Sequence, residues 1–292
     1  MPAEIPHPDR RRNAWRDDLA ADALRGVVTV PRYVAGTSCQ VITSSAPLRR
    51  QPRADAALDT EALMGEVVNV LEICDGWAWG QLARDGYVGY LPAFTLSERV
   101  AAPTHRIVVP ATLVFPAEDI KTPPLTQLSL NAEITVESTG ERLSRLASGG
   151  FVPSPHIATI DAAARDFVTV AEQFLGTPYL WGGKTRAGLD CSGLVQISLQ
   201  AAGIAAPRDS DMQASEVGDP LDPGASLGGL RRGDLVCWKG HVGIIAGAGT
   251  LLHANAHHMA VAREQLGEAI TRIAATSGAQ PSACRRLPRL GG

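Results

Sequence analysis

Three residues in the C-terminal half of the chain have the types and the order needed for nucleophilic catalysis. Cys191 lies in the segment LDCSGLV, residues 189–195, directly before a pattern that predicts a helix. His241 and His253 follow it, each in a short apolar segment that predicts a strand. A cysteine nucleophile needs a helix N-terminus or a nearby imidazole to stabilise its thiolate, and the imidazole needs a third group that orients it. The set therefore predicts the active site of a cysteine hydrolase.

The patterns around these residues predict helices followed by a sheet. A first helix is expected after Asp161, with one apolar face along residues 167–175. A second is expected to start at Asp190, which would cap it and place Cys191 at the positive end of its dipole. Asp190 is not expected as the third catalytic residue, because its charge beside the sulfur would oppose a thiolate. Strands are expected over residues 234–238, 241–246, 250–254, 259–262 and 283–287, which gives an α+β plan.

The remaining cysteines and histidines predict neither a disulfide scaffold nor a metal site. The five cysteines are scattered without CxxC spacing, which favours free thiols in a reducing compartment. His253 and His257 have the spacing of zinc ligands on a helix, but their segment has the pattern of a strand and a turn, and HExxH is absent. We therefore expect no metal and no cofactor.

The composition of the chain makes several kinds of partner unexpected. A formal net charge of −3 at pH 7 gives no basic footprint for nucleic acid. No apolar run is long enough to span a bilayer, and the first residues lack the apolar core of a signal peptide. We expect a cytoplasmic monomer without nucleic-acid or membrane partners, with export by another route left open.

The N-terminal half of the chain has the pattern of short strands. Residues 1–35 are expected to form an arm with one short helix over residues 14–24. Strand candidates at 67–71, 77–82 and 87–91 are separated by two Asp-Gly pairs, which are a strong hairpin signal. Several short strands at this spacing indicate a small β-barrel.

These strands resemble a bacterial SH3 (SH3b) domain. The resemblance rests on GEVV at 65–68, DGWA at 75–78 and GYVGYLP at 86–92, and the domain is taken to span residues 36–100. Residues 101–155 contain short β-like runs among many prolines. They are interpreted as a second, degenerate SH3b domain, with a Pro-rich linker as the alternative.

Residues 161–292 resemble the NlpC/P60 family of papain-like cysteine peptidases, and the whole domain is taken to span 156–292. The resemblance rests on GTPY (176–179), WGG (181–183), LDCSGLV (189–195), RGDLV (232–236), HVGI (241–244) and HA (253–254), in the family's order. It implies that Cys191 is the nucleophile, His241 the base and His253 the third residue. The fold class that it implies is α+β: a papain-like catalytic domain with helices packed on an antiparallel sheet, preceded by two small SH3-like β-barrels.

Family resemblance also implies the substrate, which is a cell-wall peptide cleaved between D-γ-glutamate and the next diamino acid. A narrower resemblance is to enzymes with two SH3b domains that act on trimmed murein peptides with a free N-terminal L-alanine. It implies that Glu66 and Tyr87 of the first SH3b domain bind the amine together with Asp209 and Ser210, with Glu61 and Tyr90 as substitutes. The other residues expected at the substrate are Tyr179, Trp181, Asp190 and Ser192, and ordinary packing is the alternative for the two aromatic ones.

The predicted function is hydrolysis of the γ-D-glutamyl–L-diamino acid bond, to meso-diaminopimelate or Lys, in the recycling of murein peptides. Two alternatives are kept. One is a secreted endopeptidase that remodels the cell wall, and the other is a wall-binding SH3b protein with an inactive peptidase domain. The complete set of Cys191, His241 and His253 argues against the inactive domain, and the missing signal peptide favours recycling.

Overall fold

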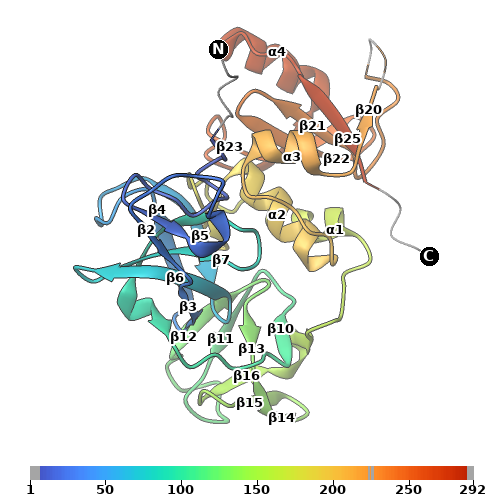
Figure 1. Cartoon of the computed structure of the whole chain (residues 1–292). Coiled ribbons are helices and arrows are strands. Elements are labelled where there is room, and N and C mark those ends of the chain that lie inside the picture. Colours follow the sequence, from blue (N-terminus) through green and yellow to red (C-terminus); the bar gives the residue numbers. More distant parts are fainter. Residues whose placement is uncertain (1–6, 223, 225–226, 288–292) are drawn as a thin grey trace. The chain divides into compact units, whose positions relative to one another are not determined.

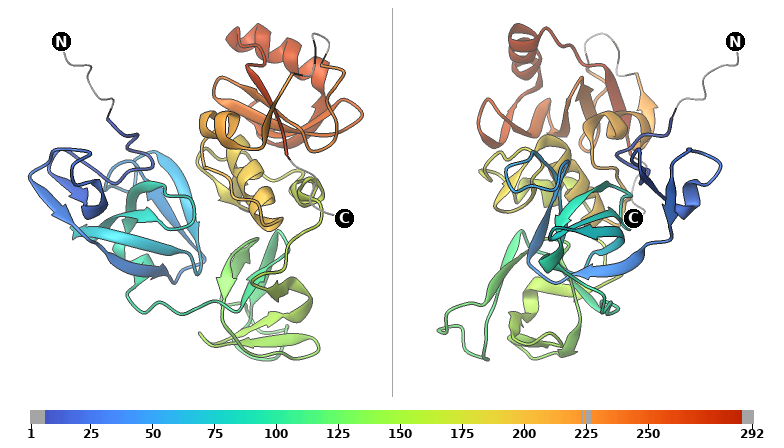
Figure 2. Two further views of the ribbon diagram at one scale, coloured as in Figure 1. Left: turned by 45° about the vertical axis from the view of Figure 1, so that its right-hand side comes forward. Right: turned by 60° about the vertical axis from the view of Figure 1, so that its left-hand side comes forward.

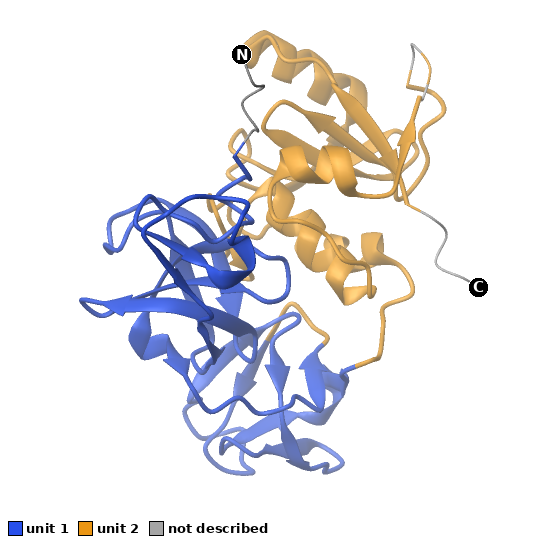
Figure 3. Ribbon diagram, in the orientation of Figure 1, with its two compact units in different colours: residues 1–107, 112–160 blue, residues 108–111, 161–292 orange. Residues whose placement is uncertain are grey.

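The chain forms two compact units. The computed structural model describes residues 7–222, 224 and 227–287. Residues 1–107 and 112–160 belong to unit 1, and residues 108–111 and 161–292 belong to unit 2 (Figure 3). Among the described residues, no helix is long and apolar enough to cross a membrane.

Unit 1 begins with an antiparallel sheet of seven strands that closes around an apolar core (Figure 1). Its core includes Val41, Leu48 and Leu91. The predicted Asp75-Gly76 hairpin is confirmed, because both residues have positive φ, as the tight turn between two twisted strands requires. In spatial order the strands are β5 (Leu58–Leu63), β4 (Ser45–Arg49), β8 (Val88–Pro92), β7 (Trp77–Leu82), β6 (Val67–Cys74), β3 (Thr37–Val41) and β9 (Leu96–Ser97).

The helix predicted over residues 14–24 is wrong. Strand β1 (Leu19–Ala21) pairs in parallel with β2 (Arg32–Val34), and only a single 3-10 turn follows β1. Leu19 packs in one cluster with Leu71 and Trp79 of the seven-stranded sheet. A short helix is marginal by itself, so packing of the segment on a formed sheet decides its structure. Residues 7–35 are therefore part of unit 1 and not a separate arm.

Strands also occupy the Pro-rich segment that follows. They form three small sheets around the buried side chains of Ile107, Leu128 and Val152. The strands are β10 (His105–Ile107), β11 (Ala111–Val114), β12 (Thr126–Ser129), β13 (Glu133–Ile134), β14 (Val136–Ser138), β15 (Leu143–Leu146), β16 (Phe151–Pro153) and β17 (Ile157–Thr159). The segment is thus a second small β-barrel and not a linker.

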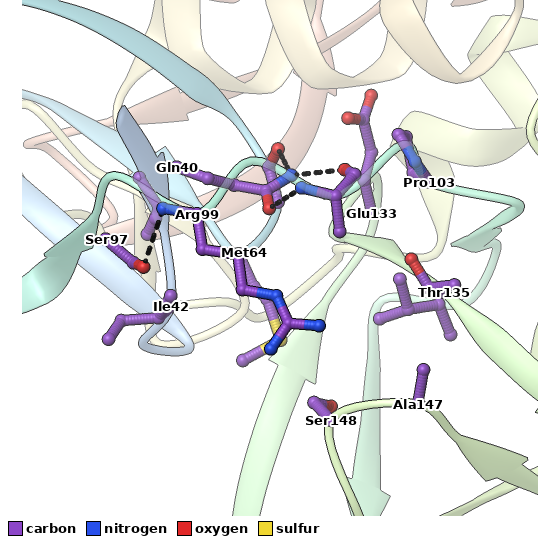
Figure 4. A pocket seen from close by; sticks show the side chains of 14 residues that line it. Gln40, Ile42, Met64, Ser97, Arg99, Pro103, Glu133, Thr135, Ala147 and Ser148 are labelled. Atoms are coloured by element: carbon purple, nitrogen blue, oxygen red, sulfur yellow. Dashed lines mark hydrogen bonds between the residues drawn. The ribbon is translucent and has the colours of Figure 1, made fainter. Parts of the chain in front are cut away.

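Polar contacts hold the two barrels of unit 1 together beside a cavity of about 290 Å³ (Figure 4). The side chain of Gln40 donates to the Gly65 and Ala101 carbonyls at 2.9 and 3.0 Å, and accepts from the Ala101 amide at 3.0 Å. Glu133, from the second barrel, lies on the cavity wall with Met64 from the first. The Glu133 amide donates to the Met64 carbonyl at 2.8 Å, so backbone as well as side chains joins the barrels.

Unit 2 is a six-stranded antiparallel sheet with helices on both faces (Figure 2). In spatial order the strands are β20 (Asp219–Leu221), β25 (Ala283–Arg286), β21 (Leu235–Trp238), β22 (His241–Gly247), β23 (Thr250–Asn255) and β24 (Ala260–Gln265). The helices are α1 (Phe167–Glu172), α2 (Cys191–Ala201), α3 (Ser210–Glu216) and α4 (Leu266–Ser277), and a short hairpin of β18 (Lys184–Thr185) and β19 (Gly188–Leu189) precedes α2. Helix α4 packs on Ile245 and Leu251, whereas the alternating residues Ile244 and Leu252 are buried on the opposite face.

Helix α1 starts later than its sequence pattern suggests. Its N-cap is Asp166 and not Asp161, because the Asp166 carboxylate accepts a hydrogen bond from the Val168 amide at 2.9 Å. The same carboxylate pairs with Arg232 at 2.8 Å. The ion pair joins α1 to the turn before β21, and this tertiary contact has no signal in the local sequence.

Candidate active site

Helix α2 places Cys191 at its first position. The predicted cap is confirmed, because the Asp190 carboxylate accepts from the Gly193 amide at 2.7 Å. A Cβ atom on residue 193 would lie only 2.3 Å from the Gly183 carbonyl oxygen, so glycine there lets the helix start pack directly on this backbone. The helix dipole at such a position stabilises a thiolate by about 0.3–1 kcal/mol when exposed and by more when partly buried.

Strands β22 and β23 bring the two predicted histidines together. The Nε2 atom of His241 lies 2.8 Å from Nδ1 of His253. The register that pairs Ile244 with Leu252 puts Gly243 opposite His253, and a Cβ on residue 243 would lie 3.2 Å from the His253 Cβ. Gly243 therefore leaves room on this face for the His253 ring beside His241.

The thiol meets β22 next to His241. The backbone amide of Val242, the residue after His241, lies close enough to the Cys191 sulfur to lower the pKa of that thiol. Nε2 of His241 is engaged with His253, so Nδ1 is the ring nitrogen that faces away from that contact. The ring of Trp238 packs beside His241, with 5.7 Å between the ring centroids. The structure thus joins His241 to His253 and places the Cys191 sulfur beside the residue that follows His241. The catalytic roles of the three residues stay a prediction.

Burial favours the neutral forms of both reacting groups. It raises the pKa of the Cys191 thiol to about 12, with help from the Asp190 charge and against the Val242 amide and Arg208. It also lowers the pKa of His241 to about 3, with His253 acting in the same direction. The resting site therefore holds a thiol and a neutral imidazole. Proton transfer between them conserves the total charge, so burial opposes it less than it opposes ionisation of either group alone.

A buried ion pair lies directly beneath the nucleophile. Arg208 donates to both oxygens of Asp190, at 2.7 and 3.0 Å, and to the Ser192 hydroxyl at 2.9 Å. The Gly182 amide donates to the same carboxylate at 2.9 Å. Arg208 offsets the Asp190 charge, which would otherwise oppose a thiolate at Cys191. Asp190 and Ser192 are engaged in these internal bonds, and their contact with substrate stays a prediction.

We expect Arg208→Ala to lower the free energy of unfolding by about 3–5 kcal/mol, because it leaves the Asp190 carboxylate buried without its cation. The matched control is Arg263→Ala, which breaks an ion pair to Glu172 whose arginine is 45% exposed. An exposed pair contributes about 0–1 kcal/mol. Urea unfolding of both variants measures the difference, and equal losses would contradict a structural role for the buried pair.

Two aromatic side chains precede the catalytic helix. Trp181 is 63% exposed, so packing in a core does not account for it. Tyr179 is half-buried, and burial and the neighbouring Cys191 raise the pKa of its hydroxyl. One aromatic ring beside the nucleophile and a second one open to solvent suit the wall of a substrate site, and contact with substrate stays a prediction for both.

Asp209 and Ser210 form the start of α3, close to the catalytic helix. Asp209 is the N-cap of α3, and its carbonyl accepts from the Gln213 amide at 2.9 Å. The Gln213 side chain donates to the Ser192 carbonyl at 2.9 Å. This bond joins the first turn of α3 to the residue after Cys191. Substrate binding by Asp209 and Ser210 stays a prediction.

Unit 1 gives Glu66 and Tyr87 internal contacts. Glu66 pairs with Arg84 at 2.8 Å and accepts from the Leu63 amide at 3.2 Å. Arg84 already pairs with this carboxylate, so a substrate amine would have to share it with the arginine. Tyr87 packs in the core of the first barrel with Leu82. Amine binding by these two residues stays a prediction.

Three side chains at β23, its turn and β24 come close to one another. Ligand atoms of His253, His258 and Glu264 lie within 4.8 Å of one another, and His257 is outside this group. His253 and Glu264 are bonded to each other at 2.7 Å, and Glu264 also pairs with Arg272. His253 and Glu264 thus belong to a hydrogen-bonded chain that ends at Arg272. Sequence reasoning missed Glu264 and Arg272, because their role depends on strand register.

Two family models and several curated proteins match parts of this chain. The family model described as "Bacterial dipeptidyl-peptidase Sh3 domain" matches residues 48–96, and the NlpC/P60 family model matches residues 176–275. A gamma-D-glutamyl-L-lysine dipeptidyl-peptidase of Bacillus subtilis is 29% identical over 222 residues, which cover 68% of this chain and 73% of that protein. A protein of the same name from Bacillus cereus is 27% identical over 235 residues, which cover 68% of this chain and 67% of that protein.

Solved structures show the same fold. The crystal structure of an NlpC/P60 family protein from Bacillus cereus has a TM-score of 0.71 at 21% identity, covering 86% of this chain and 100% of that one. An NlpC/P60 endopeptidase from Photobacterium damselae has a TM-score of 0.57 at 14% identity, covering 85% and 70%. The sequence matches lead to one assignment for each region. Residues 176–275 belong to an NlpC/P60 cysteine peptidase domain, and residues 48–96 before it belong to a bacterial SH3 domain.

Proposed function

We propose that this peptidase hydrolyses the bond between γ-D-glutamate and an L-diamino acid in murein peptides that have a free N-terminal L-alanine. The observation that carries the proposal is the likeness to two gamma-D-glutamyl-L-lysine dipeptidyl-peptidases. The alignment of 222 residues is longer than the 100 residues of the NlpC/P60 match, so the likeness extends beyond the catalytic domain. A dipeptidyl-peptidase releases two residues, which fixes the distance from the free amine to the cleaved bond.

The reaction follows from the roles of the three residues. His241 Nδ1 takes the proton of Cys191 while the sulfur attacks the γ-carbonyl carbon of D-glutamate. The tetrahedral intermediate collapses, the C–N bond breaks, and His241 returns the proton to the departing amine of the diamino acid. The dipeptide remains as a thioester on Cys191. Water, deprotonated by His241, then hydrolyses the thioester and restores the thiol.

Free-amine recognition would place this enzyme in peptide recycling. A terminal ammonium needs carboxylates to offset its loss of solvation, and the same carboxylates disfavour a chain that continues beyond the alanine. Asp209, at the start of α3, is the carboxylate of unit 2 that we propose for this purpose. All five cysteines are free thiols in the structure, which supports a reducing, cytoplasmic location.

We expect mass spectrometry to show cleavage of L-Ala-γ-D-Glu-L-Lys or its diaminopimelate analogue, without cleavage of intact sacculi. N-acetylation of the peptide should lower kcat/KM by about 100-fold or more, because a carboxylate then stays without its ammonium partner. Asp209→Asn should reduce the difference in kcat/KM between the free and the acetylated peptide. Asp211→Asn, on the exposed side of the same helix, should leave that difference unchanged. Equal cleavage of free and acetylated peptides would instead identify a general wall endopeptidase.

Activity should survive EDTA and be lost with iodoacetamide.

A further inference from the structure

We propose that Glu264 is a positioning residue of the active site, which acts through His253 to fix the tautomer of His241. The inference rests on Cys191 and His241 as the reacting pair of the proposed peptidase. It does not depend on which peptide is cleaved.

Four side chains of unit 2 form a continuous chain away from the nucleophile. His241 Nε2 lies 2.8 Å from His253 Nδ1, and His253 Nε2 lies 2.7 Å from Glu264 Oε1. Arg272 of α4 pairs with Oε1 of Glu264, and its Nε atom lies 3.4 Å from Oε2. Each ring nitrogen of His253 thus has its own partner.

Strand register brings these groups to one face of the sheet. β23 pairs with β24 so that His253 is opposite Ala262, which places Glu264 two residues farther along on the same face. Helix α4 begins at Leu266, directly after β24, and packs back over β23 and β24. Arg272 therefore returns to the carboxylate that lies eight residues before it. The His253 side chain is fully buried, and that of Glu264 is 11% exposed.

Neighbouring groups determine the charges of Glu264 and His253. Burial by itself would raise the pKa of Glu264, but Arg272 and His253 hold that pKa below its ordinary value. Glu264 is therefore a carboxylate at neutral pH. Burial lowers the pKa of His253 to about 4, against the attraction of Glu264 and with Arg272 and His258 in support. His253 is therefore a neutral imidazole.

Donors and acceptors along the chain then have one consistent order. A carboxylate only accepts, so Nε2 of His253 must donate to Glu264. A neutral imidazole has one N–H, so Nδ1 of His253 is an acceptor, and Nε2 of His241 must donate to it. His241 is left with its lone pair on Nδ1, the nitrogen that receives the thiol proton. Glu264 thus selects the tautomer in which His241 is a base toward Cys191.

Glu264→Gln tests the assignment, because an amide has nearly the same shape and can donate to His253. Donation to Nε2 would place the His253 proton on Nδ1, and the His241 proton would then face the thiol. We expect kcat to fall by about 100-fold with little change in KM. His241 would first have to move its proton back to Nε2 before Nδ1 could accept the thiol proton. The matched control is Glu268→Gln, an exposed carboxylate in the first turn of α4, which should leave kcat unchanged.

A spectroscopic readout separates positioning from a merely structural role. Long-range 1H–15N spectra of the full-length chain distinguish Nδ1–H from Nε2–H imidazoles. In the wild type, His241 and His253 should both carry the proton on Nε2, and in Glu264→Gln this pattern should change. Alkylation of Cys191 by iodoacetamide should slow in parallel, and this readout is independent of the peptide chosen. A wild-type His241 with its proton on Nδ1 would overturn the proposal, and so would an unchanged pattern in a folded Glu264→Gln variant.

Discussion

Replacing Cys191 with alanine should lower kcat by about 10⁴-fold or more, because the thioester intermediate needs the sulfur. The variant should still fold. The removed group is a single sulfur at the N-terminus of α2, and the Asp190–Arg208 ion pair beneath it is left intact. Peptide binding should persist, since the side chain contributes chemistry and little contact area. Product formation by mass spectrometry and peptide binding by calorimetry measure the two effects separately.

The matched control is Cys237→Ala. Cys237 is fully buried in β21, and burial, together with Cys284, raises the pKa of its thiol to about 12. The pKa of its thiol is raised like that of Cys191, but Cys237 lies inside strand β21, opposite Val242, and not at a helix N-terminus. Its loss should leave kcat near the wild-type value. Near-normal hydrolysis by the Cys191 variant, or its loss in the Cys237 variant, would move the nucleophile elsewhere.

Local sequence is a good guide to the catalytic residues because each is at the start or in the middle of a regular element. Asp190 followed by an apolar 3.6-residue repeat predicts where α2 begins, and the structure confirms the cap. Short apolar segments predict β22 and β23, and both strands form where the segments place them. The Asp75-Gly76 pair likewise predicts its hairpin. In these cases one short segment contains all the information that is needed.

Features that depend on distant partners are not visible in the sequence. The segment 14–24 has a helical pattern, yet it forms a strand because the first barrel offers it an apolar surface. Glu264 looks like an ordinary polar residue near a strand end until the register with β23 is known. Arg208 is next to the predicted Asp209 and Ser210, but its partner is 18 residues away on another element. Ion pairs and hydrogen-bonded chains of this kind need the tertiary structure.

Burial determines the protonation state of the resting site. The sequence places Cys191 at a helix N-terminus and predicts a histidine near it, and both features stabilise a thiolate. In the structure, loss of solvation is the largest influence on both groups and favours the neutral pair. The helix and Arg208 then act mainly on the charge that develops when the thiol attacks. This assigns to His241 the full task of removing the thiol proton.

Replacing His241 with alanine should therefore lower kcat by about 10⁴-fold, with a much smaller change in KM. The residual rate should rise about tenfold per pH unit between about pH 6 and about pH 9. Without the imidazole, Cys191 must ionise alone, and burial raises its pKa to about 12. The thiolate fraction then grows in proportion to hydroxide concentration throughout this range. The wild type should show no such slope, because the two groups titrate at about 3 and about 12.

His257→Ala is the control for the loss of an imidazole. His257 is exposed in the turn after β23 and lies outside the chain that leads from His241 to Arg272. This variant should keep both the wild-type kcat and its flat pH profile. If the His241 variant had a residual rate independent of pH, a different group would have to be taking the thiol proton. A sloping profile in the His241 variant alone would show that ionisation of the buried thiol is the step that the histidine makes possible.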